Sequence, residues 1–269
     1  TLFIFMLLSS TIVVLFFILI KISISNDRIS IYLITRLMKK ITRAQFSANL
    51  SEINQRILSA CKICSREPSE VTLLPVTKTH GEWAIEYAIQ HGLNRVGENR
   101  IQEVKEKKPK IVDGCTWELI GHLQSNKVKY AVVLFDRIQS VDSLKLIHRL
   151  DRQAELVSKK MPILLQCNAG DDPNKYGFKE SQMHEALECA LKMPHLRVDG
   201  VMTIAPLNED TESAKRCFER MGAIHNRLEA EFKIKLPELS MGMTQDLESA
   251  IAAGSTMVRV GTALFGARS

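Results

Sequence analysis

The sequence lacks the loop motifs that bind nucleotides. No Gly-x-Gly-x-x-Gly or Walker-type segment follows any of its apolar runs, which argues against a dinucleotide or a nucleoside triphosphate as the ligand. It also lacks a basic run interleaved with aromatic residues, so its formal charge of +6 predicts no nucleic-acid surface. That mild positive balance is compatible with an anionic small molecule.

Cysteine is present but is not arranged as a metal or redox site. The six cysteines include one Cys-x-x-Cys, Cys61 and Cys64, with no second pair and no histidine pattern beside it. This pair falls near the end of a helix expected over residues 46–63, whereas a thioredoxin-like pair opens a helix after a strand. We therefore expect no metal site, and reduced, structural cysteines of a cytoplasmic protein.

Charge is absent from one long segment, Thr1 to Ile20, which has the length of a membrane-spanning helix. Basic residues follow it, so an inserted segment would leave the rest of the chain facing the cytoplasm. Met38, however, opens a more ordinary soluble sequence. We favour the interpretation that residues 1–37 are a start-site artefact or a non-native upstream extension, with a membrane anchor as the alternative, and a cleaved signal peptide fits less well.

From residue 71 onward, short apolar runs alternate with longer amphipathic stretches. Strands are predicted over residues 71–77, 95–97, 117–120, 137–140, 163–168, 200–204, 238–241 and 257–260. Helices are predicted over residues 46–63, 82–90, 100–107, 127–134, 143–158, 180–192, 211–232 and 247–253. Eight βα units close most naturally into a single (β/α)8 TIM barrel over residues 38–269, with an extra N-terminal helix; a doubly wound open sheet is the alternative.

One residue departs from this pattern. Pro75 lies inside the first predicted strand, and proline cannot donate a hydrogen bond to a neighbouring strand. We therefore expect a bulge or an early end of the strand at this point.

Polar residues follow the predicted strands where barrels collect their ligand groups. Lys78 ends the first strand, and the small-residue segments Ser240–Thr244 and Arg259–Thr262 follow the seventh and eighth, where barrels commonly hold phosphate. A lysine amine can form an imine with an aldehyde, and glycine and hydroxyl residues at turns offer N–H and O–H groups to phosphate. The residues therefore predict a site for a phosphorylated aldehyde.

These segments resemble the pyridoxal phosphate homeostasis proteins, whose single barrel is similar to the N-terminal domain of alanine racemase. The resemblance runs from about residue 40 to the end of the sequence and leaves out residues 1–37. It rests on five segments, over residues 76–79, 97–99, 120–127, 240–244 and 250–266. It implies pyridoxal 5'-phosphate as the cofactor.

The resemblance also assigns roles to individual residues. The implied cofactor-binding residues are Lys78, Asn99, His122, Ser240, Gly242, Met243, Thr244, Arg259, Gly261 and Thr262. Lys78 would form the imine, and phosphate would be held by Ser240, Gly242, Gly261 and Thr262. Asn99 and His122 would line the ring face, with apolar contact from Met241 and Met243. Thr244 stands where the family often has serine and keeps the hydroxyl.

Arg259 would face the pyridine nitrogen of the cofactor. A permanently charged arginine disfavours protonation of that nitrogen and so weakens the electron sink on which most pyridoxal phosphate chemistry depends. The resemblance therefore implies a binding protein that holds the cofactor as a reversible lysine aldimine, takes part in intracellular vitamin B6 homeostasis and delivers the cofactor to apo-enzymes, without substantial catalysis.

A pyridoxal phosphate-dependent, racemase-like enzyme is the alternative. A racemase needs an acid or base on each face of its substrate, and none of the four tyrosines lies in a motif that nominates it for this role. Only three residues follow Gly266, so we expect the site to be open to water. We expect a cytoplasmic monomer, or a membrane-anchored protein facing the cytoplasm if residues 1–20 are an anchor.

Overall fold

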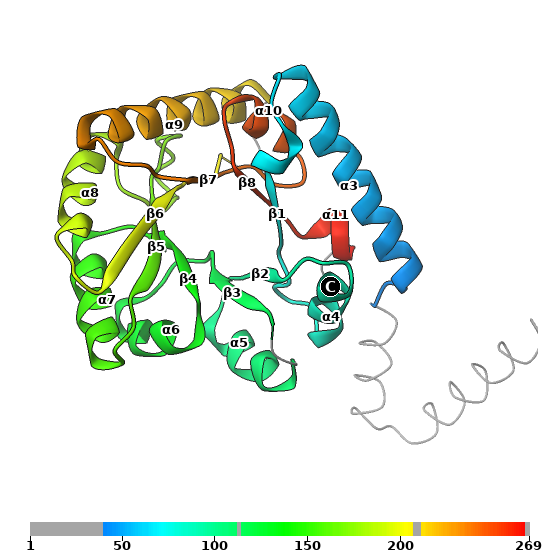
Figure 1. The fold of residues 1–269 in the computed structure, drawn as a ribbon, viewed down its shortest axis with the longest axis horizontal. Helices are drawn as coiled ribbons and strands as arrows, with labels where there is room; N and C mark the ends of the chain where they lie inside the picture. Colours follow the sequence, from blue (N-terminus) through cyan, green and yellow to red (C-terminus); the bar gives the residue numbers. More distant parts are fainter. Residues whose placement is uncertain (1–39, 112–113, 207–210, 267–269) are drawn as a thin grey trace, which may run out of the picture. The chain divides into compact units, whose positions relative to one another are not determined.

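The computed structural model describes residues 40–111, 114–206 and 211–266. From Arg43 onward these residues form one compact unit around eight parallel strands. The strands are β1 Thr72–Pro75, β2 Arg95–Glu98, β3 Thr116–Leu119, β4 Arg137–Val141, β5 Met161–Gln166, β6 Leu196–Met202, β7 Glu238–Ser240 and β8 Met257–Val260. They pair in the order β1-β8-β7-β6-β5-β4-β3-β2, which confirms the predicted barrel (Figure 1).

Helices surround the strands (Figure 1). They are α3 Arg43–Ile63, α4 Glu82–Gln90, α5 Ile101–Lys107, α6 Val128–Leu134, α7 Leu144–Leu156, α8 Met183–Leu191, α9 Thr211–Phe232, α10 Leu247–Ala252 and α11 Thr262–Phe265. Short 3-10 turns occupy Pro68–Glu70, Lys108–Lys110, Ser125–Lys127 and Glu180–Gln182. The helices expected from the sequence lie within a few residues of these bounds, whereas the four-residue α11 and the 3-10 turns were not expected.

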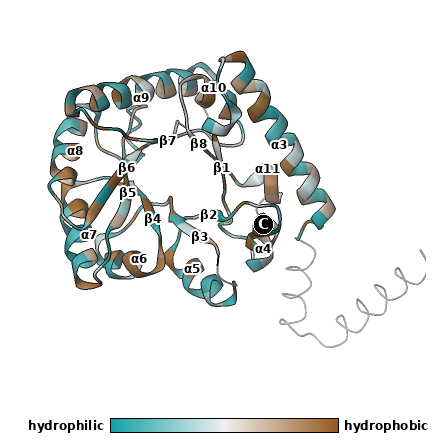
Figure 2. Ribbon diagram, viewed as in Figure 1, coloured by the Kyte–Doolittle hydropathy of each residue, from teal (hydrophilic) through white to brown (hydrophobic). Residues whose placement is uncertain are grey.

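Helix α7 shows why such segments fold as they do. The Ser143 side chain accepts a hydrogen bond from the backbone N–H of Leu146 and so caps the first turn. Leu146, Ile147, Leu150 and Ala154 recur at helical spacing and are buried against the barrel. Figure 2 shows the same mixture of hydrophobic and hydrophilic residues along the other outer helices.

Helix α3 is the predicted extra N-terminal helix, and it lies along the outside of the barrel beside α10 and α11 (Figure 1). Asn49 donates to the backbone oxygen of Leu264 in α11 (3.0 Å), and Arg56 pairs with Glu248 in α10 (2.7 Å). Since α10 and α11 begin in the segments that follow β7 and β8, α3 supports that part of the barrel from outside.

The barrel closes between β1 and β2 through very few hydrogen bonds. Val76 pairs with Gly97 in an isolated bridge, and the Thr77 amide donates to the Gly97 oxygen (3.1 Å). Amides along a strand point alternately to its two neighbours; because Thr77 faces β2, position 75 faces β2 as well. Pro75 has no N–H to offer there, which confirms the expected early end of the strand and explains the short β1–β2 pairing.

Within the described ranges, no helix is long and apolar enough to cross a membrane. The hydrophobic segment Thr1 to Ile20, on which the anchor interpretation depends, lies outside those ranges. The boundary predicted at residue 37 falls outside them too and stays a prediction.

Candidate functional site

All ten predicted site residues lie at or just after the ends of five neighbouring strands of the barrel. Lys78, Asn99 and His122 follow β1, β2 and β3, while the other seven occupy the ends of β7 and β8 or the segments after them. Since β7 pairs with β8 and β8 pairs with β1, these strand ends form one continuous arc. The fold therefore brings the lysine and the two small-residue segments to the same mouth of the barrel.

Polar contacts, one buried and one exposed, hold the backbone on both sides of Lys78. Lys107 Nζ donates to the Thr77 backbone oxygen (2.9 Å), and the Thr79 backbone N–H donates to Glu103 Oε2 (2.7 Å). Thr79 adopts a φ of 68°, a conformation that is unfavourable for a β-branched residue. The contacts from α5 thus hold a strained backbone that sets the position of the half-buried Lys78.

Glu98 lies at the centre of these contacts and is fully buried. Its Oε1 accepts from Thr77 Oγ1 and from Lys107 Nζ, both at 2.7 Å, while its Oε2 has no hydrogen-bond partner in the described structure. Burial raises the pKa of the Glu98 carboxyl, and Lys107 and Thr77 oppose that rise. Glu98 therefore ties the end of β1 to the end of β2, directly before Lys78 and Asn99.

Ser240 and Arg259 contact each other inside the mouth. Arg259 Nη1 donates to Ser240 Oγ (2.7 Å), and Nη2 donates to the Thr203 backbone oxygen (2.8 Å). The Ser240 hydroxyl in turn donates to Gln139 Oε1 (2.7 Å). Both sides of this hydroxyl are engaged by protein groups, so in this structure it positions Arg259, and its predicted contact with phosphate stays a prediction.

Arg259 combines burial with unused donors. It is 4% exposed, and burial lowers the pKa of its guanidinium to about 10, which leaves it charged at neutral pH. In the described residues, only Ser240 and Thr203 accept hydrogen bonds from this side chain, which carries five N–H groups. The remaining N–H groups suit an acceptor such as a pyridine nitrogen, so the residues present fit the implied cofactor.

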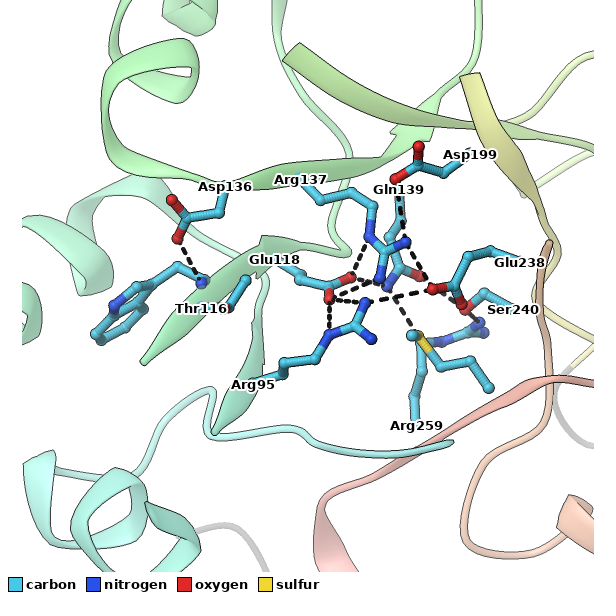
Figure 3. Close-up of polar contacts among 12 residues, drawn as sticks. Arg95, Thr116, Glu118, Asp136, Arg137, Gln139, Asp199, Glu238, Ser240 and Arg259 are labelled. Carbon is cyan, nitrogen blue, oxygen red and sulfur yellow. Dashed lines mark hydrogen bonds and ion pairs between the residues drawn. The ribbon is translucent and has the colours of Figure 1, made fainter. Parts of the chain in front are cut away.

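A polar network inside the barrel connects this arginine to the opposite end of the strands (Figure 3). Gln139 Nε2 donates to Glu118 Oε2 (2.6 Å), and Glu118 also accepts from Arg95 and Arg137. Arg137 further contacts Glu238 at 2.8 Å. The donors therefore point in one direction, from Arg259 through Ser240 and Gln139 to Glu118.

Sequence reasoning missed this network. Glu118 and Gln139 are fully buried and Arg137 is 6% exposed, although all three types usually stay near water. The available signal was the alternation in β4, where Arg137 and Gln139 share one face of the strand with Ile138 between them. That pattern places two polar groups inside the barrel, where they need buried partners.

Two glycines allow close packing beside the site. Gly242 has a φ of 92°, and a Cβ there would lie 2.5 Å from the Ala250 Cβ. A Cβ at Gly261 would lie 3.1 Å from the Val76 backbone oxygen, which places the β8 loop against the end of β1. Thr262, the next residue, is exposed and opens α11. Phosphate contacts by these residues stay predictions.

The segment after β7 is fixed by contacts with α10 and α3. The Met243 N–H donates to Asp246 Oδ1 (2.5 Å), and Arg56 Nη2 donates to the Thr244 backbone oxygen (2.8 Å). Both residues are half-buried, whereas Met241 is fully buried in the core. Met243 and Thr244 therefore remain at the edge of the mouth, and Met241 packs beneath it.

His122 belongs to a stacked cluster at the mouth. Its ring lies 3.6 Å from the Tyr176 ring with an angle of 8° between the planes, and its Nδ1 lies 2.8 Å from Asp142 Oδ2. Asn99 is half-buried, and its backbone lies so close to Gly121 that a Cβ on Gly121 would be 2.5 Å from the Asn99 oxygen. The ends of β2 and β3 are thus packed together, which brings His122 near Asn99.

The six cysteines are free thiols. Cys61 and Cys64 lie at the end of α3, as predicted. Burial raises the pKa of Cys115 and of Cys167 to about 12, so these two thiols stay protonated at neutral pH.

Comparisons with known proteins agree with the fold and identify the family. The family model described as alanine racemase, N-terminal domain, matches residues 43–269. The pyridoxal phosphate homeostasis protein of Escherichia coli K12 is 36% identical over 224 residues, which cover 82% of this chain and 95% of that protein. The corresponding protein of Aquifex aeolicus is 36% identical over 220 residues, 81% of this chain and 96% of its own length.

Solved structures give the same result. PipY of Synechococcus elongatus without pyridoxal phosphate has a TM-score of 0.72 and 37% identity, covering 80% of this chain and all of PipY. The PipY structure with pyridoxal phosphate bound has a TM-score of 0.70 and 35% identity. Alanine racemase of Clostridium difficile, at 14% identity and a TM-score of 0.62, shares the fold. The chain therefore belongs to the alanine racemase N-terminal domain family and, by its similarity to full-length relatives, to the pyridoxal phosphate homeostasis proteins.

Proposed function

We propose that this protein binds pyridoxal phosphate reversibly through Lys78 and holds it for delivery in vitamin B6 homeostasis. One observation carries the proposal: the half-buried Lys78 and the buried, charged Arg259 lie at one mouth, where Arg259 has N–H donors that the described residues do not use. The names of the relatives and the cofactor bound to PipY support the choice of ligand.

Each group at the mouth has a distinct task in this proposal. The Lys78 amine condenses with the cofactor aldehyde and releases water, so the bond can form and hydrolyse without any oxidant. Arg259 directs an N–H toward the ring nitrogen and keeps it from gaining a proton. The cofactor supplies an electron sink when bound, and Arg259 weakens that sink, which favours storage over catalysis.

The test uses the full chain with pyridoxal phosphate. We expect a visible absorbance band that borohydride abolishes, with the reduced label on Lys78 after peptide mapping. Lys78→Ala should lose the label but still bind pyridoxal phosphate weakly, because the phosphate contacts do not need the lysine. Pyridoxal, which lacks the phosphate, should not bind this variant. Lys145→Ala, an exposed lysine of α7, is the matched control and should behave as the parent. A label spread over surface lysines, or equal affinity of Lys78→Ala and the parent, contradicts the proposal.

A racemase-like activity is the second candidate function. The observation in its favour is the pair His122–Asp142, stacked on Tyr176, which places a group able to accept a proton at the mouth. We expect no turnover across a panel of L-amino acids, measured by exchange of the α-hydrogen for deuterium. Steady-state exchange that both Lys78→Ala and His122→Ala abolish would establish the enzyme instead.

A further inference from the structure

A pocket of about 420 Å³ opens at the ends of β2 and β3. It is lined by the segment that leads into α5 and by the segment between β3 and α6: Asn99, Arg100, Ile101, Gln102, Leu119, His122, Leu123, Gln124 and Lys127. Asn99 and His122 belong to both this pocket and the predicted ring face. The pocket is therefore a lateral extension of the proposed cofactor site.

The charged side chains that line this pocket are both positive. Arg100 and the half-buried Lys127 line it, and none of its lining residues is acidic. In the ranges that the structure describes, neither side chain makes a hydrogen bond or an ion pair, unlike Lys107 and Lys110, which pair with glutamates on the same side of the barrel. Gln102 and Gln124 add amide groups that can donate. Two unpaired cations and amide donors around one hollow suit a carboxylate.

Two contacts connect the pocket to the backbone beside Lys78. The hydrogen bond from Thr77 Oγ1 to Glu98 Oε1 (2.7 Å) ties together the residues directly before Lys78 and Asn99. The close approach of Gly121 to Asn99 then ties the β2 end to the segment that carries His122. The lysine and the pocket thus lie at the connected ends of β1, β2 and β3.

We propose that this pocket binds the carboxylate of amino compounds that take the cofactor from Lys78. The inference rests on the proposed function and names the class of acceptor: amines that carry a carboxylate near the amino group, such as α-amino acids. In the exchange the incoming amine bonds to the carbon that Lys78 releases. The two hydrogens that the amine nitrogen loses as it takes over the double bond to that carbon go to Lys78 Nζ, which leaves as a primary amine, so nothing is oxidised or reduced.

The first test needs no cofactor. N-acetylglycine ends in a carboxylate and N-acetylglycinamide in an amide, and neither has a reactive amine. Their binding to the cofactor-free protein is followed through the backbone NMR signals of Asn99 and Gln124 at low salt. We expect N-acetylglycine alone to shift these signals. Arg100→Gln and Lys127→Gln should each weaken its binding by about fivefold, as for loss of an exposed ion pair of ~1 kcal/mol, whereas Lys145→Gln should not.

The second test measures exchange in the cofactor-loaded protein. The rate at which glycine or glycinamide displaces the cofactor from Lys78 is measured for each variant. Dividing it by the parent rate for the same amine cancels the different basicities of the two amines. We expect Lys127→Gln to lower the rate with glycine several-fold and to leave the rate with glycinamide unchanged. Equal effects on both amines, or equal binding of the two acetylated probes in the first test, overturn the carboxylate site.

The two proposals fail in different ways. If the parent protein carries no borohydride-reducible label on Lys78, the proposed function fails and the exchange through Lys78 fails with it, while the acetylated probes still show whether the pocket binds carboxylates. If the label is on Lys78 and the probes do not distinguish carboxylate from amide, only the inference about the pocket is wrong.

Discussion

Replacing Gln139 by leucine tests whether the buried polar chain holds Arg259 and stabilises the fold. Leucine keeps most of the side-chain volume but removes the donor to Glu118 (2.6 Å) and the acceptor for Ser240 (2.7 Å). A hydrogen bond to a charged group contributes about 1.5–3 kcal/mol, and a neutral one about 0.5–1.5 kcal/mol. The Ser240 hydroxyl also loses its acceptor, which adds to the destabilisation. Burial of the apolar leucine side chain offsets roughly 1 kcal/mol of this loss. We expect Gln139→Leu to lower the free energy of unfolding by about 3 kcal/mol.

Urea unfolding of the parent and the variant measures this difference. Gln90→Leu is the control, because Gln90 is exposed at the end of α4 and should change the free energy of unfolding by less than about 0.5 kcal/mol. A double-mutant cycle with Ser240→Ala then tests the connection between the two side chains, with an expected coupling energy above about 0.5 kcal/mol. A stability of Gln139→Leu within 0.5 kcal/mol of the parent, or strictly additive effects, would refute the reasoning.

Three further changes test individual groups. Arg259→Glu should shift the absorbance of bound pyridoxal phosphate toward the form with a protonated ring nitrogen, since a carboxylate favours that proton; an unchanged spectrum contradicts the placement of Arg259. Gly242→Ala should cost about 2–4 kcal/mol in urea unfolding, because φ is 92° and the new Cβ meets Ala250 at 2.5 Å, whereas Gly92→Ala, with a φ of 79° and open space, should cost less. Burial raises the pKa of Glu98 above its ordinary value of 4.5, so the folded state keeps this proton to higher pH and the free energy of unfolding falls as pH rises between the two pKa values. Glu98→Gln should remove that part of the slope, and an identical pH profile would count against it.

The sequence predicted the barrel because its strands and helices have distinct patterns. Short β-rich runs such as β8 stand between amphipathic stretches such as α7, which indicates parallel βαβ units, and eight such units favour a closed barrel over the doubly wound alternative. The observed strand ends lie within four residues of their predicted positions, and β8 matches at both ends; at β1, Pro75 ends the strand two residues early. The four-residue α11 was not predicted because a single helical turn is too short to show a hydrophobic periodicity.

The candidate site was predictable only in part. Lys78, Asn99 and His122 could be placed because barrel geometry puts every strand end at one mouth. The contacts that position them could not, since Lys107 reaches Thr77 from a neighbouring helix and Gln139 reaches Ser240 across the barrel. Such contacts depend on three-dimensional packing between residues far apart in the chain, so the residue types alone do not predict them. Ser240 is an example: its place at the end of β7 was predictable, but the contacts of its hydroxyl with Gln139 and Arg259 were not.

The short pairing between β1 and β2 has a dynamic consequence. The backbone bridge between Val76 and Gly97, with the hydrogen bond from the Thr77 amide, joins these two strands, and Glu98 and Lys107 add side-chain contacts to Thr77. By contrast, β5 and β6 share a backbone ladder along their whole length. Opening the seam breaks fewer backbone hydrogen bonds than separating β5 from β6, so it should occur as a local fluctuation without global unfolding. In native-state hydrogen exchange we expect the Thr77 amide to exchange well before those of β5 and β6. Because Lys78 and Asn99 border the seam, each such opening would widen the mouth beside the lysine and give a bulky acceptor a route to it.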